Sequence, residues 1–596
     1  MTLVIDPPRR TAAVPVRRPR RMLPWLLAAG WFAQVCVRLW FARARTGPVA
    51  NPDETGYLVA ARWLAGGHGA DLSDNTFYQA GYPLLLAPAY WASHDPVTVY
   101  TIVLVINALA GACLFPLGYL AARRFGLSRR SALPLAWAAA LLPAVTVFGA
   151  FALADAVLPV LVLGWLLLLD RFARAGRARD AVAASAVVGC AACVHSRGSV
   201  LLAVHVGALA VLAAYAWFRA PRAGGREDGP QGGAPRGGAP RAAWARACLA
   251  GLAAAVAVYL LESWLNDTLK AALYPGGTRD LAGNLEHRLT TLDGQAWALS
   301  GAAGQVWYLV VSTWGLAGAG LVAVAAALLR RRTPAGTRVA AGALLAATCG
   351  IAYASSAALP DEHRVGNFVY GRYLACLALV YALAGAAVLV RAGTRPAARC
   401  AAGAALVLAG TGLWVTAYAG ERLRTHSYIA FDFPETSFLT GDRTALHLVA
   451  ASFAALGLLC AFLGAGRAGG RAPVAVALLL AGVNVAAATF VAGPSPKRVE
   501  PVPPLARAAV SGGVAVDPSL DWRLRTMLMY PVWWTRIGRT DTRAGQPAPG
   551  VCTVVVGLPE GAPVAASWPR HPAGWRPEEH RSWNLRWVAW YAPSCG

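Results

Sequence analysis

The sequence has little charge, and acidic residues are the scarcest of its charged groups. Charged residues make up 14% of the 596 residues, only 29 are aspartate or glutamate, and 57% of the chain is hydrophobic. A soluble protein usually carries about 25% charged residues. So little charge excludes an ordinary soluble enzyme and indicates a protein that lies largely in a membrane.

The hydrophobic runs also lack the alternation of polar and apolar residues that membrane-barrel strands show. They are rich in Leu, Ala, Val and Gly, and most approach the roughly 17 to 25 residues that a helix needs to cross a bilayer. A helix also satisfies its own backbone hydrogen bonds in lipid. The sequence therefore predicts an all-α polytopic membrane protein with about thirteen transmembrane helices. The predicted spans are 23–42, 97–121, 131–149, 154–169, 181–196, 199–218, 246–264, 304–329, 338–358, 374–390, 400–419, 445–465 and 473–492.

Lysine is nearly absent, with Lys270 and Lys497 alone, so that arginine supplies most of the positive charge behind the net +25. A charge this large could indicate a nucleic-acid partner. The arginines, however, recur in the short loops on one side of the predicted bundle, as the positive-inside rule requires. We therefore interpret the charge as orientation, with no nucleic-acid partner, the N-terminus inside and the C-terminus outside. The dominance of arginine and alanine suggests a GC-rich genome and hence a bacterial plasma membrane.

The transmembrane domain is predicted to cover 23–493, and its first external loop, 43–96, is more than a connection. Residues 54–64 place apolar side chains along one side of an amphipathic helix. Residues 82–91 form a second apolar piece, which is too short to span a membrane and contains two prolines. We expect this piece to lie along the membrane interface.

Three segments outside the spans differ from the rest in composition. Residues 1–22 are basic and form the predicted cytoplasmic N-terminus. Residues 219–245 are rich in Gly, Pro and Arg and predict a disordered cytoplasmic linker. Residues 494–596 contain short β-type runs, and about 100 residues can form a small domain. They predict an extracytoplasmic domain that is α/β or β-rich.

Of the eleven cysteines, nine lie in or beside predicted spans, and none has a convincing metal-site spacing. Cys552 and Cys595 lie instead in the predicted C-terminal domain. If that domain is outside, the two could form a disulfide, which persists in an oxidising compartment.

Two adjacent carboxylates, Asp53 and Glu54, stand out in a chain so poor in acid. They open the predicted helix of the first external loop, where acidic side chains commonly cap backbone amides and face the helix dipole. They also lie at the mouth of the bundle, where a lipid-borne substrate would present its head group. A carboxylate there could act as a general base on a hydroxyl, so the pair is a cap, a catalytic site or both.

The residues around this pair resemble a known family. The stretch 53–57, Asp-Glu-Thr-Gly-Tyr, and the stretch 60–64, Ala-Ala-Arg-Trp-Leu, resemble the first external loop of integral-membrane glycosyltransferases of the C superfamily (GT-C). Residues 81–88 resemble the segment that follows. The family includes protein O-mannosyltransferases, the lipid A aminoarabinose transferase and mycobacterial arabinofuranosyltransferases. The resemblance implies transfer of a sugar from a polyprenyl-phosphate carrier, at the outer face, to a cell-envelope glycan, lipid or protein.

The resemblance also implies further site residues. It places a second acidic residue at Asp155, where relatives more often have Glu. Aspartate keeps the negative charge, but its side chain is shorter. It implies basic residues that contact the carrier phosphate, and the segment around Arg372 and Tyr373 is similar to one such segment. Arg197, next to His195 at the outer end of the bundle, is another candidate, because arginine matches phosphate bidentately. The alternative for each arginine is a side chain that snorkels to the membrane interface.

A divalent metal is the one cofactor that the sequence leaves open. His363 could ligate a metal together with Asp53 or Glu54, since carboxylates and imidazole suit several divalent ions. Some GT-C relatives require a metal and others do not, and the alternative for His363 is a solvated loop. Four other basic residues of the predicted external loop 265–303 cannot be ranked as phosphate ligands: Lys270, Arg279, His287 and Arg288.

Together these residues predict an inverting glycosyl transfer. Asp53 is the expected general base, Glu54 and Asp155 are expected to orient the acceptor or a metal, and Tyr57 is expected to contact substrate. A transporter or flippase of lipid-linked precursors is the alternative. It predicts ionisable residues near mid-membrane and paired repeats, whereas the spans here are nearly free of charge. A third possibility is an envelope scaffold whose tail binds wall polymer.

Overall fold

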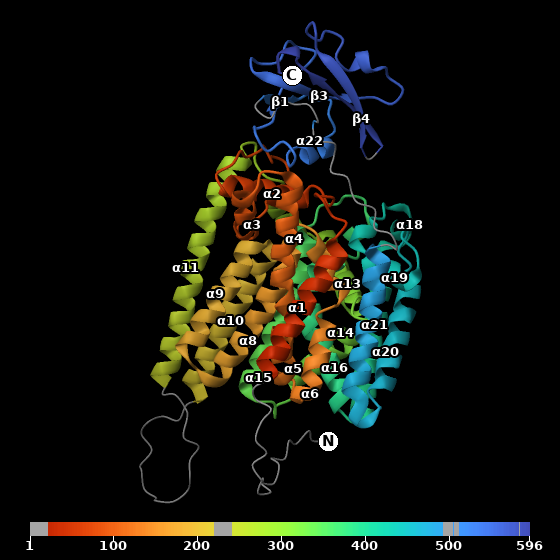
Figure 1. Ribbon diagram of the computed structural model, residues 1–596. Helices are drawn as coiled ribbons and strands as arrows, with labels where there is room; N and C mark the ends of the chain where they lie inside the picture. The colour runs from red at the N-terminus through yellow and green to blue at the C-terminus, as the bar shows by residue number, and fades with distance from the viewer. Residues whose placement is uncertain (1–21, 220–240, 493–504, 506–511, 583, 596) are drawn as a thin grey trace, which may run out of the picture.

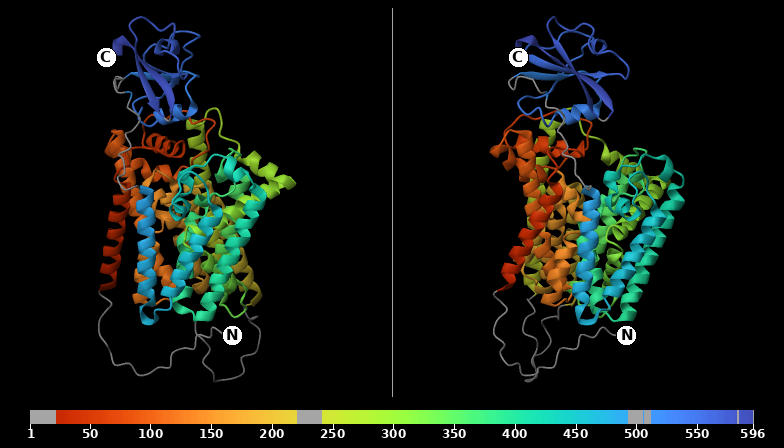
Figure 2. Two further views of the ribbon diagram at one scale, coloured as in Figure 1. Left: turned by 90° about the vertical axis from the view of Figure 1, so that its right-hand side faces the viewer. Right: turned by 45° about the vertical axis from the view of Figure 1, so that its right-hand side comes forward.

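The computed structural model describes residues 22–219, 241–492, 505, 512–582 and 584–595 (Figure 1). It consists of a long helical bundle that carries a small β-sheet domain at one end, which we call the sheet end (Figures 1 and 2). Nearly all of the predicted N-terminal segment 1–22, most of the predicted linker 219–245 and the start of the predicted C-terminal domain lie outside the described residues.

The predicted polytopic membrane protein is confirmed. Within the described residues, eight helices are long and apolar enough to cross a membrane, and ten if each of two bent pairs counts as one span. The eight candidate spans are Met22–Ala42, Pro96–Arg124, Ser196–Ala214, Ala242–Leu273, Ala335–Ala358, Thr394–Ala419, Leu448–Ala465 and Gly469–Ala492. They correspond to α1 (Met22–Ala42), α4 (Pro96–Ala112) with α5 (Leu114–Arg124), α10 (Ser196–Arg219), α11 (Arg241–Leu273), α15 (Ala335–Ala358), α17 (Thr394–Ala419), α20 (Leu448–Ala465) and η6 (Gly469–Arg471) with α21 (Ala472–Ala492).

This number is smaller than the thirteen spans predicted. The predicted spans 181–196 and 374–390 are helices α9 (Ala178–Val194) and α16 (Ala375–Arg391), which have only 17 residues each. At about 1.5 Å per residue such helices are about 26 Å long, at the short end of the range for a spanning helix. The predicted span 154–169 is α8 (Leu158–Ala175), whose 18 residues include three charged ones.

Two predicted spans are sharply bent. The predicted span 304–329 is divided between α13 (Leu292–Val311) and α14 (Leu316–Leu329). The chain bends by 113° between these two helices. Gly315, between them, has a φ of 82°, a backbone conformation that glycine adopts without steric cost. The other bent pair joins α6 (Arg129–Ala139) to a segment that contains α7 (Pro143–Thr146) and η1 (Phe148–Ala150), at 67°.

The first external loop contains both predicted short helices, α2 (Asp53–Leu64) and α3 (Gly81–Ala92). Both lie at the sheet end of the bundle (Figure 1). Helix α2 is buried all round from Glu54 to Arg62 rather than on one side only, because α3, α4, the segment 148–157 and the sheet domain pack around it. The remaining short helices are η2 (Ala154–Ala156), α12 (Leu281–Thr290), η3 (Val365–Asn367), η4 (Gly371–Tyr373), α18 (Arg422–Thr425), η5 (Ala430–Asp432) and α19 (Pro434–Thr440).

The C-terminal domain is the predicted mixture of α and β structure. Its five strands have the order β2-β1-β3-β5-β4, with β1 parallel to β2 and β3, and β5 antiparallel to β3 and β4. Cys552 and Cys595 are joined in a disulfide. The elements are β1 (Gly513–Val516), α22 (Trp522–Leu528), β2 (Gly538–Arg539), β3 (Val551–Leu558), η7 (Val564–Ser567), β4 (Arg576–Ser582), β5 (Leu585–Tyr591) and η8 (Pro593–Cys595).

Specific contacts fix the sheet domain to the first external loop. Buried Arg62 of α2 donates from Nη1 to the carbonyl oxygens of Tyr530 and Val532, at 3.2 and 3.3 Å. The Tyr530 hydroxyl in turn donates to the carbonyl of Pro96 at 2.5 Å. Because a buried guanidinium needs its hydrogen bonds satisfied, these contacts tie the domain to the segment that begins at Asp53.

Candidate active site

Four charged residues from four separate segments meet at the sheet end of the bundle. Arg372 of η4 lies between two carboxylates: its Nη2 is 2.7 Å from Asp53 Oδ2, and its Nε is 3.0 Å from Asp155 Oδ2. Asp155 is held from its other oxygen by Arg197, at the start of α10, with 2.7 Å between Nη2 and Oδ1. The structure thus brings together four residues that were predicted separately from positions up to 319 residues apart.

The members of this cluster differ in how far a substrate could reach them. The side chains of Asp155, Arg197 and Arg372 are 4%, 3% and 8% exposed, whereas that of Asp53 is 32% exposed. Burial alone would raise the pKa of Asp155, but Arg197 and Arg372 outweigh it and hold that pKa well below its usual range. Asp155 is therefore a fixed negative charge between two arginines, and Asp53 is the accessible carboxylate.

Neither arginine snorkels to an interface. Both are buried, and Arg197 has its remaining donors committed, because Nη1 donates to the carbonyls of Arg372 and Tyr373 at 3.1 and 3.2 Å. His195 accepts from the Arg197 backbone N–H at 3.2 Å and from Nε at 3.3 Å through Nδ1. Burial and the neighbouring Arg197 keep the pKa of His195 well below its usual value. The neutral ring therefore acts as an acceptor that holds Arg197.

The carboxylate of Asp53 does not cap its own helix. Pro52 occupies the cap position of α2, and no side chain makes a capping hydrogen bond there. Asp53 instead accepts a hydrogen bond from the Tyr78 hydroxyl on Oδ1, at 3.2 Å, and faces Arg372 with Oδ2. Of the two interpretations that the sequence left open, the geometry fits the one in which Asp53 faces the site.

Glu54, in contrast, faces away from this cluster and is fully buried. Its Oε2 accepts from the backbone N–H groups of Val49 and Ala50 at 2.6 and 2.7 Å. Its Oε1 accepts from the Tyr100 hydroxyl at 2.5 Å and from the Ala152 N–H at 2.7 Å. A carboxylate has about four lone-pair positions, so no oxygen is left for a substrate or a metal. The expected role of Glu54 in orienting an acceptor therefore does not fit this geometry.

Tyrosines form the wall beside Asp53. Tyr57 is buried, and its ring centroid lies 5.0 Å from that of Tyr78 and 5.1 Å from that of Tyr82. A Cβ on Gly56 would approach the Tyr78 ring to 2.1 Å, so a glycine is needed where this ring crosses α2. Tyr57 thus packs within this wall, in the electrostatic field of Asp53 and Arg372, and its contact with substrate stays a prediction. Tyr78 was not predicted, because nothing in the sequence marks a tyrosine 25 positions away as a partner of Asp53.

The residues expected to bind a metal do not come together. The His363 side chain is 82% exposed. The acidic side chain that it approaches is that of Asp361, with 4.0 Å between Nδ1 and Oδ1. Within the described part of the chain, no group of three or more His, Cys, Asp or Glu side chains could hold a metal ion. The set of Asp53, Glu54 and His363 is therefore not a metal site in this geometry.

One further acidic residue near the cluster was not predicted. Asp432 of η5 is buried, its Oδ2 lies 3.8 Å from Arg364 Nη1, and this oxygen has no hydrogen-bond partner among the described residues. Burial raises the pKa of Asp432 to about 6, against the opposing effect of Arg364 and Arg372. The sequence signal is modest: an acidic residue between aromatic ones, in the stretch Phe-Asp-Phe that ends at residue 433.

The chain thus forms a polytopic helical bundle with a charged cluster at one end, beneath a small α/β domain. Among solved structures, the chain is similar to ArnT from Cupriavidus metallidurans bound to undecaprenyl phosphate, with a TM-score of 0.53 and 17% identity over 96% of this chain and 99% of that one. The apo state of the same protein gives a TM-score of 0.52 and 17% identity over 94% and 98%. This likeness shows that the chain shares the fold of that protein. No protein-family model and no curated protein sequence matches the chain.

Proposed function

We propose that this protein is a membrane glycosyltransferase that moves a sugar from a polyprenyl-phosphate donor to a hydroxyl of a cell-envelope acceptor. The proposal places the site at the outer face of the bacterial plasma membrane, with the N-terminus inside. The observation that carries it is the cluster in which Arg372 bridges Asp53 and Asp155. The likeness to ArnT, which was solved with undecaprenyl phosphate, supports a polyprenyl phosphate as the carrier.

Asp53 is the proposed general base. Two hydrogen bonds, from Tyr78 and Arg372, occupy its carboxylate, and an acceptor hydroxyl binds to it once a donor phosphate draws Arg372 toward itself. As the acceptor oxygen attacks the anomeric carbon, its proton passes to Asp53. The bond from that carbon to the phosphate oxygen breaks on the opposite side, and the polyprenyl phosphate leaves with the electron pair. This course inverts the anomeric centre.

Arg372 is the proposed partner of the departing phosphate. Its Nε and Nη2 bind the two carboxylates, and no described residue accepts a hydrogen bond from Nη1. A guanidinium has five N–H donors in a planar fork, so Arg372 can bind a phosphate oxygen while it stays attached to Asp155. Positive charge aimed at the leaving group stabilises the charge that develops in the transition state. Arg197, His195 and Tyr373 are proposed to hold this arrangement in place.

An open apolar groove on the helical bundle suits the lipid part of such a donor. It has a volume of about 510 Å³, and it is lined only by apolar residues of α19, α20 and α21, among them Phe438 and Leu439. Phe438 follows Asp432 by six residues, so the groove begins on the segment that leads from the charged region. A polyprenyl chain can pack against an apolar surface of this kind.

The test is turnover of lipid-linked sugar by the purified protein. The protein is incubated with a panel of polyprenyl-phosphate sugars and with envelope material as acceptor, and released polyprenyl phosphate is measured. We expect release by the wild type, little release by Asp53→Asn, and normal release by Asp95→Asn. Asp95 lies in the same loop and caps α4, a role that asparagine also fills.

If no donor gives more release with the wild type than with Asp53→Asn, the proposed function is wrong. Donor translocation without release would favour the flippase alternative.

A further inference from the structure

A small cavity lined with arginines lies at the junction of the sheet domain and the first external loop, and the proposed transfer does not use it. Its volume is about 110 Å³, which is room for several water molecules or for one small oxyanion. Three arginines and a single carboxylate line it, together with apolar side chains: Asp71, Val516, Arg525, Met529, Arg536, Ile537, Gly538 and Arg539.

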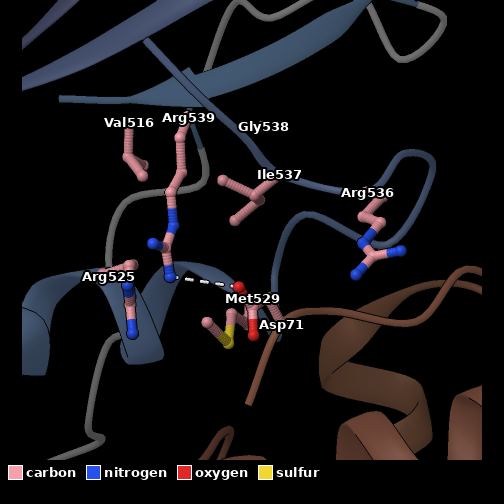
Figure 3. Close-up of a pocket in the computed structure, with 8 residues that line it drawn as sticks. All are labelled: Asp71, Val516, Arg525, Met529, Arg536, Ile537, Gly538 and Arg539. Atoms are coloured by element: carbon pink, nitrogen blue, oxygen red, sulfur yellow. Dashed lines mark hydrogen bonds and ion pairs between the residues drawn. The ribbon is translucent and has the colours of Figure 1, made fainter. Parts of the chain in front are cut away.

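The charges around this cavity do not balance. Arg539 Nη2 is paired with Asp71 Oδ2 at 3.0 Å, which leaves the other two arginines without a carboxylate of their own. The Nε of Arg525 is buried without a hydrogen-bond partner, and Arg536 forms no ion pair within the described residues. Figure 3 shows Arg539 reaching Asp71 from the sheet, Arg525 beside it on α22, and Arg536 on the other side.

The walls of this cavity belong to two parts of the chain that are fixed to each other. Arg525 and Met529 lie on or next to α22, and the carbonyl of the next residue, Tyr530, accepts from Arg62 of α2. Asp71 belongs to the loop between α2 and α3, seven residues before Tyr78, whose hydroxyl binds Asp53. The cavity is therefore fixed to the same loop that carries Asp53 and Tyr78.

We infer that this cavity binds an oxyanion, and that the oxyanion is a carboxylate or phosphate group carried by the acceptor. Guanidinium groups bind both with charge-assisted, bidentate hydrogen bonds. Two unpaired arginines at a partly enclosed site favour a ligand with at least one full negative charge. The statement that the anion belongs to the acceptor rests on the proposed glycosyl transfer, whereas binding of the anion itself does not.

The experiment measures anion binding by the full-length protein in a phosphate-free buffer. Inorganic phosphate and glucuronate are titrated separately by calorimetry into the wild type and into Arg525→Gln/Arg536→Gln. The matched control is Arg543→Gln/Arg570→Gln, which removes two exposed arginines of the same domain that do not line the cavity. The tighter of the two probes distinguishes a phosphate-bearing from a carboxylate-bearing ligand.

We expect saturable binding of at least one probe by the wild type, binding weakened about tenfold or more in the cavity variant, and less than twofold change in the control. Tenfold corresponds to about 1.4 kcal/mol. If the double variant does not fold, Arg536→Gln alone carries the test, because this side chain is exposed. Equal affinity in all variants, or no saturable binding of either probe, overturns the inference. Binding requires no turnover, so absence of sugar transfer would refute the proposed function and leave this result intact.

Discussion

Changing Asp53 or Glu54 to its amide should have opposite effects: Glu54→Gln should lower stability, and Asp53→Asn should lower activity. In Glu54→Gln, one oxygen still accepts two hydrogen bonds, but the new amide group faces two donors. Each hydrogen bond to a charged group is worth about 1.5–3 kcal/mol, so two lost bonds should cost about 3–6 kcal/mol of stability. Asp53→Asn leaves one oxygen that can accept from Arg372, and Arg372 keeps its ion pair with Asp155, so this change should cost less stability than Glu54→Gln.

Activity should follow the reverse order. Asp53→Asn removes the proposed general base, which typically contributes about 10²–10⁴-fold in rate. Glu54→Gln leaves the cluster in place, so each folded molecule should keep most of its rate. The assays are thermal unfolding in detergent, and release of polyprenyl phosphate per folded protein at a temperature where both variants are intact. The reasoning is refuted if Glu54→Gln loses a hundredfold in rate with an unchanged melting temperature, or if Asp53→Asn is the less stable variant.

Three further predictions concern Asp432, Arg372 and Arg62. Because burial raises the pKa of Asp432 from 3.8 to about 6, the folded protein should hold this proton more tightly than the unfolded chain. The contribution is fully present below pH 4 and is lost as pH rises through 6, by about 3 kcal/mol at 1.36 kcal/mol per unit. Asp432→Asn should remove this part of the pH dependence in unfolding experiments between pH 4 and 7, and identical profiles would contradict the assignment. Arg372→Ala should raise the donor KM more than the acceptor KM in steady-state assays, and the reverse order would count against its phosphate role. Arg62→Ala leaves the carbonyls of Tyr530 and Val532 without their donor, so hydrogen exchange in α22 should accelerate; unchanged exchange would show that other contacts hold the domain.

The sequence was sufficient to place the cluster but not to assign every role in it. Asp155, Arg197 and Arg372 each lie at the end of a predicted span, Asp53 lies in the loop on the same predicted side, and buried charged side chains must find partners. Glu54 could not be assigned in the same way. Successive residues of a helix point about 100° apart, so two neighbouring carboxylates at a helix start reach different surroundings.

Other features depend on contacts that no local pattern reveals. Tyr78 and Asp432 come near the site from segments whose path is set by the whole fold, and neither belongs to a motif of known spacing. Helices α9 and α16 have 17 residues each, at the short end of the range for a spanning helix. Hydropathy identifies such helices correctly and does not by itself say whether they cross the bilayer.

Arg372 has a double attachment that predicts the order in which substrates bind. Its Nη2 lies against Asp53 Oδ2 at 2.7 Å, in a position that an acceptor hydroxyl would use. A donor phosphate that draws Arg372 toward itself frees this oxygen, while the bond from Nε to Asp155 keeps the arginine in the site. The acceptor should therefore bind productively only after the donor.

This order can be measured from the kinetics of the purified protein. Added polyprenyl phosphate should compete with the donor, and a saturating donor concentration should lower the apparent acceptor KM. Arg372→Lys is the informative variant, because one ammonium cannot bridge both carboxylates in the planar manner of a guanidinium. With Asp53 no longer held, the acceptor KM in this variant should become independent of donor concentration. If the wild type already shows that independence, Arg372 does not control access to Asp53.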